Sequence, residues 1–164
     1  MNSNKPGHIL LLGANHETAP VAIRERLSFA EEEVPKALAI LMDMPVIQEV
    51  ILFSTCNRVE ILLTSGDIPE AVESVKAFLR AQKQLSEEQY EKIHYLYQDE
   101  DAVRHLFRVA SGLDSMIMGE PQIFGQIKAA YRQAVTQQTT GVILNRLIHR
   151  TFFVAKRVRS ETGI

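Results

Sequence analysis

One short polar segment of the chain combines a thiol with a guanidinium group. The residues Ser54-Thr-Cys-Asn-Arg58 separate two apolar runs, and their composition is typical of a turn. A thiolate is a nucleophile suited to acyl transfer, and the cation of Arg58 favours the thiolate form of Cys56. A lone cysteine is otherwise most often a small buried apolar residue. The polar neighbours Thr55 and Asn57 weaken that alternative, but the residues alone leave both interpretations open.

Arg58 also has two interpretations. An arginine at the start of a strand is commonly solvated and contributes little. Its planar guanidinium is also the group best suited to bind a carboxylate through two parallel hydrogen bonds. The second interpretation predicts a substrate that carries a carboxylate.

A second polar cluster lies in the segment from Gly112 to Gln126, between two predicted helices. Glu120 precedes Pro121, and Gln122 and Gln126 are four residues apart, which places polar groups on one face at the start of a helix. Taken alone, this pattern favours a helix cap with two exposed amides.

His105 lies in the middle of a predicted helix, beside Leu106 and Val109. It is interpreted either as a structural histidine satisfied by one hydrogen bond or as a general acid–base group, since imidazole titrates near neutral pH. The other four histidines show no metal-ligand spacing, so we expect no metal site. The pattern G-x-G-x-x-G is absent from the sequence, so no nicotinamide site is predicted in this chain.

Apolar periodicity and turn residues predict the elements that hold these groups. Strands are expected at residues 9–14, 46–53, 58–64 and 93–97. Helices are expected at residues 21–27, 29–42 (with a capping box formed by Ser28 and Glu31), from Pro69 onward, 99–110, 121–137 and 142–159, with Gly112 and Gly141 as helix stops. The order β-α-β-β-α-β predicts an α+β fold, with a ferredoxin-like sheet lobe that carries helices on one face. A helical part follows it, and its last member is a long connector helix.

The composition limits the class of protein. The chain has 164 residues, 46% of them hydrophobic and 23% charged, with a net charge of −2. These values are typical of a folded soluble domain. A single cysteine excludes a disulfide framework and indicates a reducing, cytoplasmic compartment. We find no signal peptide and no segment that spans a membrane. The near-neutral charge argues against a dedicated nucleic-acid-binding protein but leaves room for a local basic face.

Three segments, taken together, resemble one known family. They are Gly13-Ala-Asn-His-Glu-Thr-Ala-Pro-Val-Ala-Ile-Arg-Glu-Arg26, Ser54-Thr-Cys-Asn-Arg-Val-Glu60 and Ala110-Ser-Gly-Leu-Asp-Ser-Met-Ile-Met-Gly-Glu-Pro-Gln-Ile-Phe-Gly-Gln126. The resemblance is to the N-terminal catalytic domain of glutamyl-tRNA reductase and covers essentially the whole chain. That family makes glutamate-1-semialdehyde from glutamyl-tRNA(Glu) with NADPH, the first step of the tRNA-dependent route to 5-aminolevulinate and the tetrapyrroles.

The resemblance implies a role for each candidate residue. Cys56 matches the nucleophile that forms a thioester with the glutamyl group, and His105 matches a histidine important for activity. The positions that match substrate-binding residues are Thr55, Asn57, Arg58, Ser115, Glu120, Pro121, Gln122 and Gln126, with Arg58 as the partner of the glutamate side-chain carboxylate.

The resemblance also implies what lies outside this chain. Residues 1–141 match the catalytic, substrate-binding domain, and residues 142–164 match the start of the connector (spinal) helix. The NADPH and dimerisation domains of the family are absent here, so the NADPH site is expected elsewhere. The partners implied are glutamyl-tRNA(Glu), glutamate-1-semialdehyde aminomutase and, for the full-length enzyme, a second copy in a homodimer. The alternative is a non-catalytic aminoacyl-tRNA or partner-binding module of the same fold. The joint presence of Cys56, Arg58 and His105 favours the enzyme.

Overall fold

The computed structural model describes residues 7–115 and 122–162, and one four-stranded antiparallel sheet forms its centre. The strands lie in the order β2-β3-β1-β4. Their bounds are His8–Asn15 for β1, Glu49–Ser54 for β2, Arg58–Ser65 for β3 and Tyr95–Gln98 for β4. The predicted α+β class is confirmed.

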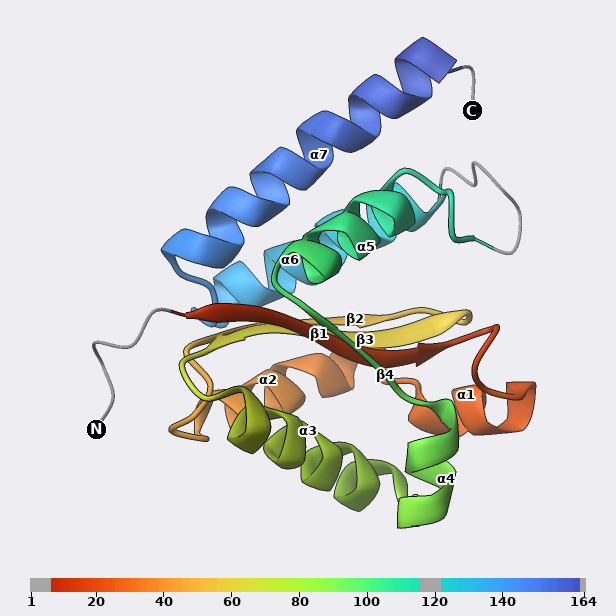
Figure 1. Ribbon diagram of the computed structural model, residues 1–164, viewed down its shortest axis with the longest axis vertical. Helices are drawn as coiled ribbons and strands as arrows, with labels where there is room; N and C mark the ends of the chain where they lie inside the picture. Colours follow the sequence, from red (N-terminus) through yellow and green to blue (C-terminus); the bar gives the residue numbers. More distant parts are fainter. Residues whose placement is uncertain (1–6, 116–121, 163–164) are drawn as a thin grey trace.

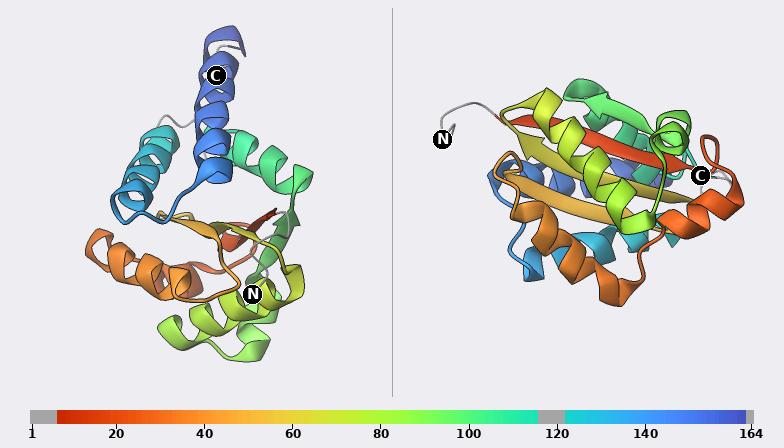
Figure 2. Two further views of the ribbon diagram at one scale, coloured as in Figure 1. Left: turned by 90° about the vertical axis from the view of Figure 1, so that its left-hand side faces the viewer. Right: turned by 90° about the horizontal axis from the view of Figure 1, so that it is seen from below.

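Helices cover both faces of this sheet (Figures 1 and 2). On one face lie α1 (Val21–Leu27), a 3-10 turn (Glu31–Glu33), α2 (Val34–Met42), α3 (Ile68–Lys83) and α4 (Glu87–Ile93). On the other face lie α5 (Glu100–Ala110), α6 (Gln122–Thr136) and α7 (Val142–Thr162). The helices of the predicted lobe lie on one face of the sheet, as expected. The position of the later helices was not predicted: α5 contacts β1 and α6 contacts β2 from the second side. Every position of β3 is consequently buried.

A glycine at the middle of the sheet opens space for a buried carboxylate. In the strand register Gly13 of β1 lies opposite Glu60 of β3 on one side and opposite Tyr95 of β4 on the other. A Cβ atom at Gly13 would lie 2.9 Å from Cγ of Glu60 and 2.3 Å from the carbonyl oxygen of Val59. The absence of a side chain at Gly13 therefore lets the Glu60 side chain extend over β1.

The segment after α1 differs from its prediction. Ser28 was expected to cap a helix that begins at Phe29, but its hydroxyl donates to the carbonyl oxygen of Glu25 at the end of α1. The 3-10 turn then precedes α2, which begins at Val34 with Pro35 in its first turn. Proline is well tolerated there because its missing N–H has no partner in the first turn of a helix.

Ser86 and Gln89 form a capping box. The Ser86 hydroxyl accepts from the Gln89 backbone N–H, and the Gln89 side chain accepts from the Ser86 N–H, each at 3.0 Å. This box begins α4, a helix for which no bounds were predicted. Because α4 continues to Ile93, the last strand begins two residues later than expected, at Tyr95.

Glu49 on β2 connects the sheet to the start of α7. Its carboxylate accepts from the backbone N–H of Gly141 at 2.5 Å, from that of Leu144 at 3.0 Å and from the Thr64 hydroxyl at 3.0 Å. Gly141 was predicted as a helix stop, but it immediately precedes α7 and so marks a helix start. Gly112, with a φ of 81°, follows α5 as predicted.

The outer edge of β2 is covered by the loop between α6 and α7. The N–H of Val50 donates to the carbonyl oxygen of Thr139 at 2.8 Å, and the Thr139 hydroxyl donates to the carbonyl oxygen of Val50 at 2.7 Å. Both outward-facing backbone groups of Val50 are therefore paired.

Within the described ranges, no helix has both the length and the apolar character needed to cross a bilayer.

Candidate functional site

The turn between β2 and β3 holds Cys56 at the surface. The backbone N–H of Thr55 donates to the carbonyl oxygen of Arg58 at 2.8 Å, and the Thr55 hydroxyl accepts from the N–H groups of Asn57 and Arg58 at 3.2 Å. The side chain of Thr55 thus fixes the turn from inside. Cys56 is exposed, which contradicts the alternative of a buried structural cysteine and leaves the thiol accessible to a substrate.

The side chain of Arg58, two residues later, points inward. It is 2% exposed. Its Nη1 lies 3.4 Å from Oε2 of Glu60, and its Nη2 donates to the carbonyl oxygen of Asp114 at 2.7 Å. These contacts fix the plane of the guanidinium group. The structure therefore excludes the interpretation of Arg58 as a freely solvated side chain.

Glu60 is the centre of this buried network. Its Oε2 accepts from the Tyr95 hydroxyl at 2.6 Å and lies 2.5 Å from Nε2 of His105, in addition to the contact with Arg58. Burial by itself raises the pKa of Glu60, but the hydrogen bond and charge of His105, the charge of Arg58 and the hydrogen bond of Tyr95 outweigh it and hold the pKa below its ordinary value. Glu60 is therefore a carboxylate at neutral pH.

Burial and the neighbouring carboxylate act in the opposite direction on Tyr95. Desolvation first, and then the charge of Glu60, raise the pKa of the Tyr95 hydroxyl well above its ordinary value. The phenol consequently stays protonated and remains a hydrogen-bond donor to Glu60.

His105 is held by both of its ring nitrogens. Nε2 faces Glu60, and Nδ1 lies 3.7 Å from Oδ2 of Asp114. The ring also stacks on Tyr97, with 4.5 Å between the ring centroids. Asp114 is fixed in turn by Arg108, whose Nη2 donates to its Oδ1 at 3.1 Å. His105 is thus a buried, oriented member of the network that contacts Arg58 through Glu60.

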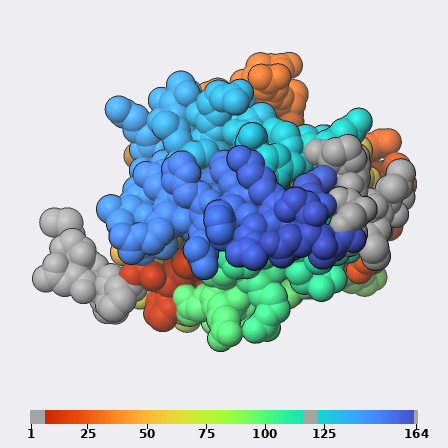
Figure 3. Space-filling view, turned by 90° about the horizontal axis from the view of Figure 1, so that it is seen from above, coloured from red at the N-terminus to blue at the C-terminus, as the bar shows by residue number. Residues whose placement is uncertain are grey.

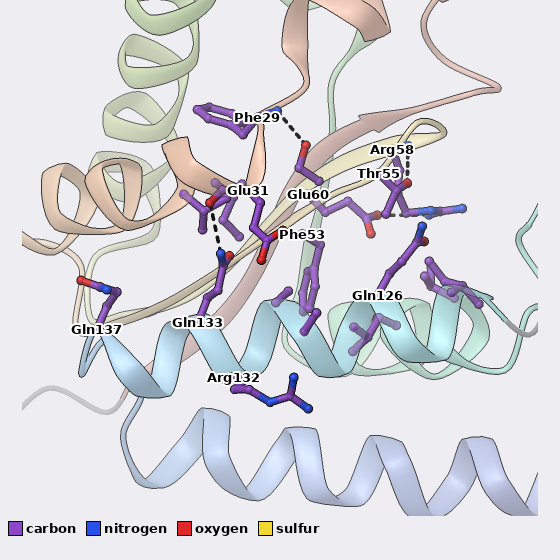
Figure 4. Close-up of a pocket in the computed structure, with 18 of the residues that line it drawn as sticks. Phe29, Glu31, Phe53, Thr55, Arg58, Glu60, Gln126, Arg132, Gln133 and Gln137 are labelled. Atoms are coloured by element: carbon purple, nitrogen blue, oxygen red, sulfur yellow. Dashed lines mark hydrogen bonds and ion pairs between the residues drawn. The ribbon is translucent and has the colours of Figure 1, made fainter.

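A cavity of about 500 Å³ lies beside this network, between α6 and the end of the β2–β3 hairpin (Figure 4). Thr55, Arg58 and Glu60 line one end, and Gln126 rises from α6 toward Arg58. Apolar side chains line much of the remaining wall, among them Phe53, whose ring points toward α6. Such a cavity, apolar with a few fixed polar groups, is typical of a small-molecule site.

Four other predicted site residues do not line this cavity: Cys56, Asn57, Ser115 and Gln122. Ser115 is half-buried and directly follows Asp114, and Gln122 is exposed at the first position of α6. Glu120 and Pro121 lie outside the described residues. The structure brings together four predicted site residues: Thr55 of the turn after β2, Arg58 of β3, His105 of α5 and Gln126 of α6.

Three members of the network were not among the predicted site residues: Glu60, Tyr95 and Asp114. For Glu60 a signal existed, because Arg58 and Glu60 are charged residues at alternate positions of an otherwise apolar strand and must share one face. For Asp114 no comparable signal existed, since its contact with Arg58 joins residues far apart in the sequence.

No group of three or more metal-ligating side chains occurs in residues 7–115 and 122–162. Among the charged residues that line the cavity, Arg58 and Glu60 are paired with each other.

Together the fold and the site define a class: an α+β domain with an exposed thiol on a hairpin turn, beside a cavity whose wall holds a buried Arg–Glu–His network. Comparison with known proteins is consistent with this class. The profile of the family described as "Glutamyl-tRNAGlu reductase, N-terminal domain" matches residues 12–162. The chain belongs to this family.

Individual relatives agree with the family match. The chain is 52% identical over 158 residues to a glutamyl-tRNA reductase of Syntrophobacter fumaroxidans, with 96% of this chain and 34% of that protein covered. It is 49% identical over 156 residues to one of Desulfatibacillum aliphaticivorans, with 95% and 36% covered. The solved glutamyl-tRNA reductase of Methanopyrus kandleri superimposes with a TM-score of 0.77 at 29% identity, over 93% of this chain and 34% of that one. The chain thus spans about a third of the length of the relatives it matches.

Proposed function

We propose that this chain is the domain of a glutamyl-tRNA reductase that receives the glutamyl group on the thiol of Cys56. The observation that supports this most directly is the exposure of Cys56 on a turn whose next residues, Arg58 and Glu60, line a cavity of suitable size. The family membership supplies the substrate, glutamyl-tRNA(Glu), and the pathway toward 5-aminolevulinate and the tetrapyrroles.

The proposed step transfers the glutamyl group from an ester to the thiol and so forms a thioester. The Cys56 sulfur attacks the carbonyl carbon of the glutamyl ester, so that a C–S bond forms and the C–O bond to the terminal ribose breaks. The proton lost by the thiol ends on the ribose oxygen, and the tRNA leaves as the free alcohol. A thioester is more electrophilic than the ester from which it forms, which prepares the glutamyl carbonyl for reduction.

Arg58 is proposed to bind the glutamate side-chain carboxylate, with Thr55, Asn57, Ser115, Glu120, Pro121, Gln122 and Gln126 as further substrate contacts. The contacts of Arg58 with Glu60 and Asp114 support this role, because they fix the guanidinium before the substrate arrives. His105 is proposed to act through Glu60 as a positioning residue for Arg58.

The described residues do not form a Rossmann-type site for NADPH. In that fold a nicotinamide dinucleotide binds at the carboxyl ends of parallel strands beside a helix N-terminus, whereas the described strands pair antiparallel. We propose that its site belongs to the two thirds of the relatives that this chain does not span, and we place no reduction step on the residues of this chain.

The wider organisation is proposed on the same basis. The strand order and antiparallel pairing support the name ferredoxin-like for residues 8–98. Residues 1–141 are proposed as the catalytic domain, and α7 is proposed as the start of a connector helix. A homodimer of the full-length enzyme, an encounter with glutamate-1-semialdehyde aminomutase and a cytoplasmic location complete the proposal.

The test of this function is covalent acylation. We expect the chain, incubated with glutamyl-tRNA(Glu), to gain the mass of one glutamyl group, and Cys56→Ser to gain none, because a serine hydroxyl here lacks a base that would activate it. Mass spectrometry measures the adduct, and circular dichroism checks that the variant, changed at an exposed position, keeps its fold. An undiminished adduct in Cys56→Ser contradicts the proposal.

A second measurement examines Arg58. Arg58→Lys keeps the charge but loses the planar guanidinium group, which can form two parallel hydrogen bonds with a carboxylate. We therefore expect the affinity for glutamyl-tRNA(Glu) to fall by more than about twofold. A twofold change corresponds to roughly 0.4 kcal/mol, which is less than the contribution of one hydrogen bond. Deacylated tRNA is the control ligand, since it lacks the carboxylate. Equal affinity of the variant and the original chain for the glutamyl form means that Arg58 does not hold the carboxylate.

The chain by itself is expected to release glutamate slowly from glutamyl-tRNA and to form no semialdehyde, even with saturating NADPH. Both products are measured in one assay, together with the absorbance of the nicotinamide. Semialdehyde formed at an appreciable rate would place a nicotinamide site within this chain.

A further inference from the structure

The outward face of α7 carries a concentration of positive charge that the proposed thioester chemistry does not use. From Gln122 to Thr162 the sequence contains seven Lys and Arg residues and one acidic residue, Glu161, which gives a net charge of +6 in a chain whose total is −2. The rest of the chain is therefore strongly acidic, and the two parts differ in sign. Such asymmetry within one domain is typical of a surface that binds a polyanion.

The helical spacing gathers the charges of α7 on one side. Steps of three and four residues along an α-helix keep side chains on the same face. The residues of this face are exposed, and we call them the basic face: Arg146, His149, Arg150, Phe153, Lys156 and Arg157. The opposite side of α7 is buried, at Leu144, Leu147, Ile148, Thr151 and Ala155. In the space-filling view α7 crosses the surface with α6 along one side and α5 along the other (Figure 3).

An aromatic ring lies at the middle of the basic face. Phe153 is 50% exposed. The guanidinium carbons of Arg150 and Arg157 lie 5.4 and 5.9 Å from the centroid of its ring. An exposed aromatic ring with cations close to it is a combination found in proteins that bind unpaired nucleotides, where the ring stacks on a base and the cations bind phosphates.

The basic face is also linked to the candidate site. Arg159 of α7 donates to the carbonyl oxygen of Ala110 at the end of α5, four residues before Asp114, which in turn accepts from Arg58. In Figure 1, α7 runs upward from the side where β1 begins toward the side where the turn between β2 and β3 lies. A polymer lying along α7 therefore extends toward the end of the molecule that holds Cys56.

We infer that the basic face binds the phosphate backbone of the RNA whose aminoacylated end reaches Cys56. This inference rests on the proposed function for the identity of the RNA. An acidic protein segment is the competing partner, but it offers no base to stack on Phe153. Glu161 pairs with Arg157 through contacts of 3.0 and 2.8 Å, so Arg146, Arg150 and Lys156 contribute most of the charge available to phosphates.

The test compares two double variants with the same net charge. Arg150→Gln with Lys156→Gln removes two charges from the basic face. Lys36→Gln with Lys92→Gln removes two exposed charges from α2 and α4, on the opposite side of the sheet. Glutamine is a good helix former at all four positions. The ligand is deacylated tRNA(Glu), and fluorescence anisotropy at several salt concentrations gives the affinity and its salt dependence.

We expect the basic-face variant to bind about tenfold more weakly near 0.1 M salt, with a slope of log K against log salt reduced by about one for each charge removed. The control variant should keep the slope of the original chain. Phe153→Ala should weaken binding severalfold without changing the slope, because stacking releases no counterions. Equal slopes for the two double variants overturn the inference, and so does an acidic peptide, poly-glutamate, that binds the basic face while the tRNA does not.

The two proposals fail separately. If the chain binds deacylated tRNA through the basic face but forms no acyl adduct on Cys56, the proposed function is wrong and the RNA surface stands. If Cys56 is acylated while the two double variants bind tRNA with equal slopes, the proposed function stands and the RNA surface is wrong.

Discussion

Two buried glutamates at opposite ends of the β2–β3 hairpin show how one residue type serves two purposes. Glu49 pairs in register with Thr64, and Glu60 pairs with Phe53 at the other end. Both carboxylates are buried, with exposures of 7% and 1%. Glu49 accepts from two backbone N–H groups and a hydroxyl, whereas Glu60 faces an arginine, a histidine and a tyrosine.

The difference lies in what each carboxylate holds. The partners of Glu49 are the backbone of Gly141 and Leu144, so its charge fixes where α7 begins. The partners of Glu60 are side chains, one of which, Arg58, lines the cavity, so its charge fixes the orientation of a group in the cavity wall. The identity of the partner, rather than burial, distinguishes an architectural carboxylate from one that belongs to a site. Four substitutions or conditions test this distinction.

The largest effect is expected from Glu60→Ala. It leaves Arg58 and His105 buried without their counter-ion, which destabilises the fold by about 3–5 kcal/mol, and we also expect acylation of Cys56 to slow at least tenfold. Glu60→Gln keeps the shape and an acceptor for Tyr95, so it separates the loss of charge from a loss of fold. Urea unfolding and the rate of glutamyl adduct formation are the measurements. If Glu60→Gln is acylated as fast as the original chain, the charge of Glu60 serves the architecture, as that of Glu49 does, and not the site.

Glu49→Ala is expected to reduce stability by about 1–3 kcal/mol, because three donors, two of them buried, lose their acceptor. The rate of acylation of Cys56 should stay within about twofold, a difference smaller than one hydrogen bond. Glu49→Gln, which retains an acceptor oxygen, should recover part of the stability. The distinction between the two glutamates fails if Glu49→Ala slows acylation as much as Glu60→Gln does.

Tyr95→Phe removes a single hydrogen bond to the Glu60 carboxylate. We expect a loss of about 1.5 kcal/mol in the free energy of unfolding, the lower end for a bond to a charged group. The matched control is Tyr97→Phe, since Tyr97 contacts His105 through its ring. Equal losses in the two variants would indicate that the bond to Glu60 has no special strength.

The smallest effect is expected at acid pH. Between pH 5 and 4 the contribution of Glu60 to the free energy of unfolding should fall by about 1 kcal/mol or less. The pKa of Glu60 is lowered in the folded state. Its contribution to stability is therefore present in full above the ordinary pKa of a glutamate and is lost as the pH falls through the lowered value. Unfolding free energies measured from pH 7 to pH 3 should fall more steeply for the original chain than for Glu60→Gln. Parallel profiles would contradict the lowered pKa.

The sequence predicted most elements of the fold, but it did not predict where the last three helices pack. Apolar periodicity located the strands and helices to within a few residues, since it reflects which side of each element is buried. The same periodicity does not say which face of a sheet an amphipathic helix covers, so the packing of α5, α6 and α7 on the second face was not predictable in this way. At Ser28 a capping pattern was overridden by a nearer acceptor, the carbonyl oxygen of Glu25.

The candidate site was predictable where it is local. The turn around Cys56 is set by neighbours within three residues, and its polar composition indicated an exposed thiol. The role of Glu60 depends on the strand register that places it opposite Gly13, and on α5 crossing the sheet above it. Both are consequences of tertiary packing, which a pattern of residue types does not contain.

The pairing of Thr139 with Val50 has a consequence for aggregation at high protein concentration. β2 is the outermost strand on its side of the sheet, and its sequence Glu-Val-Ile-Leu-Phe-Ser is almost wholly apolar. An open strand of this kind is a template for a strand of another molecule, and chains that meet in this way aggregate. Thr139 pairs with the outward N–H and C=O of Val50, so these groups of the second residue of β2 are not available to another strand. The loop between α6 and α7 thereby covers part of the β2 edge and hinders edge-to-edge pairing of two copies of this chain.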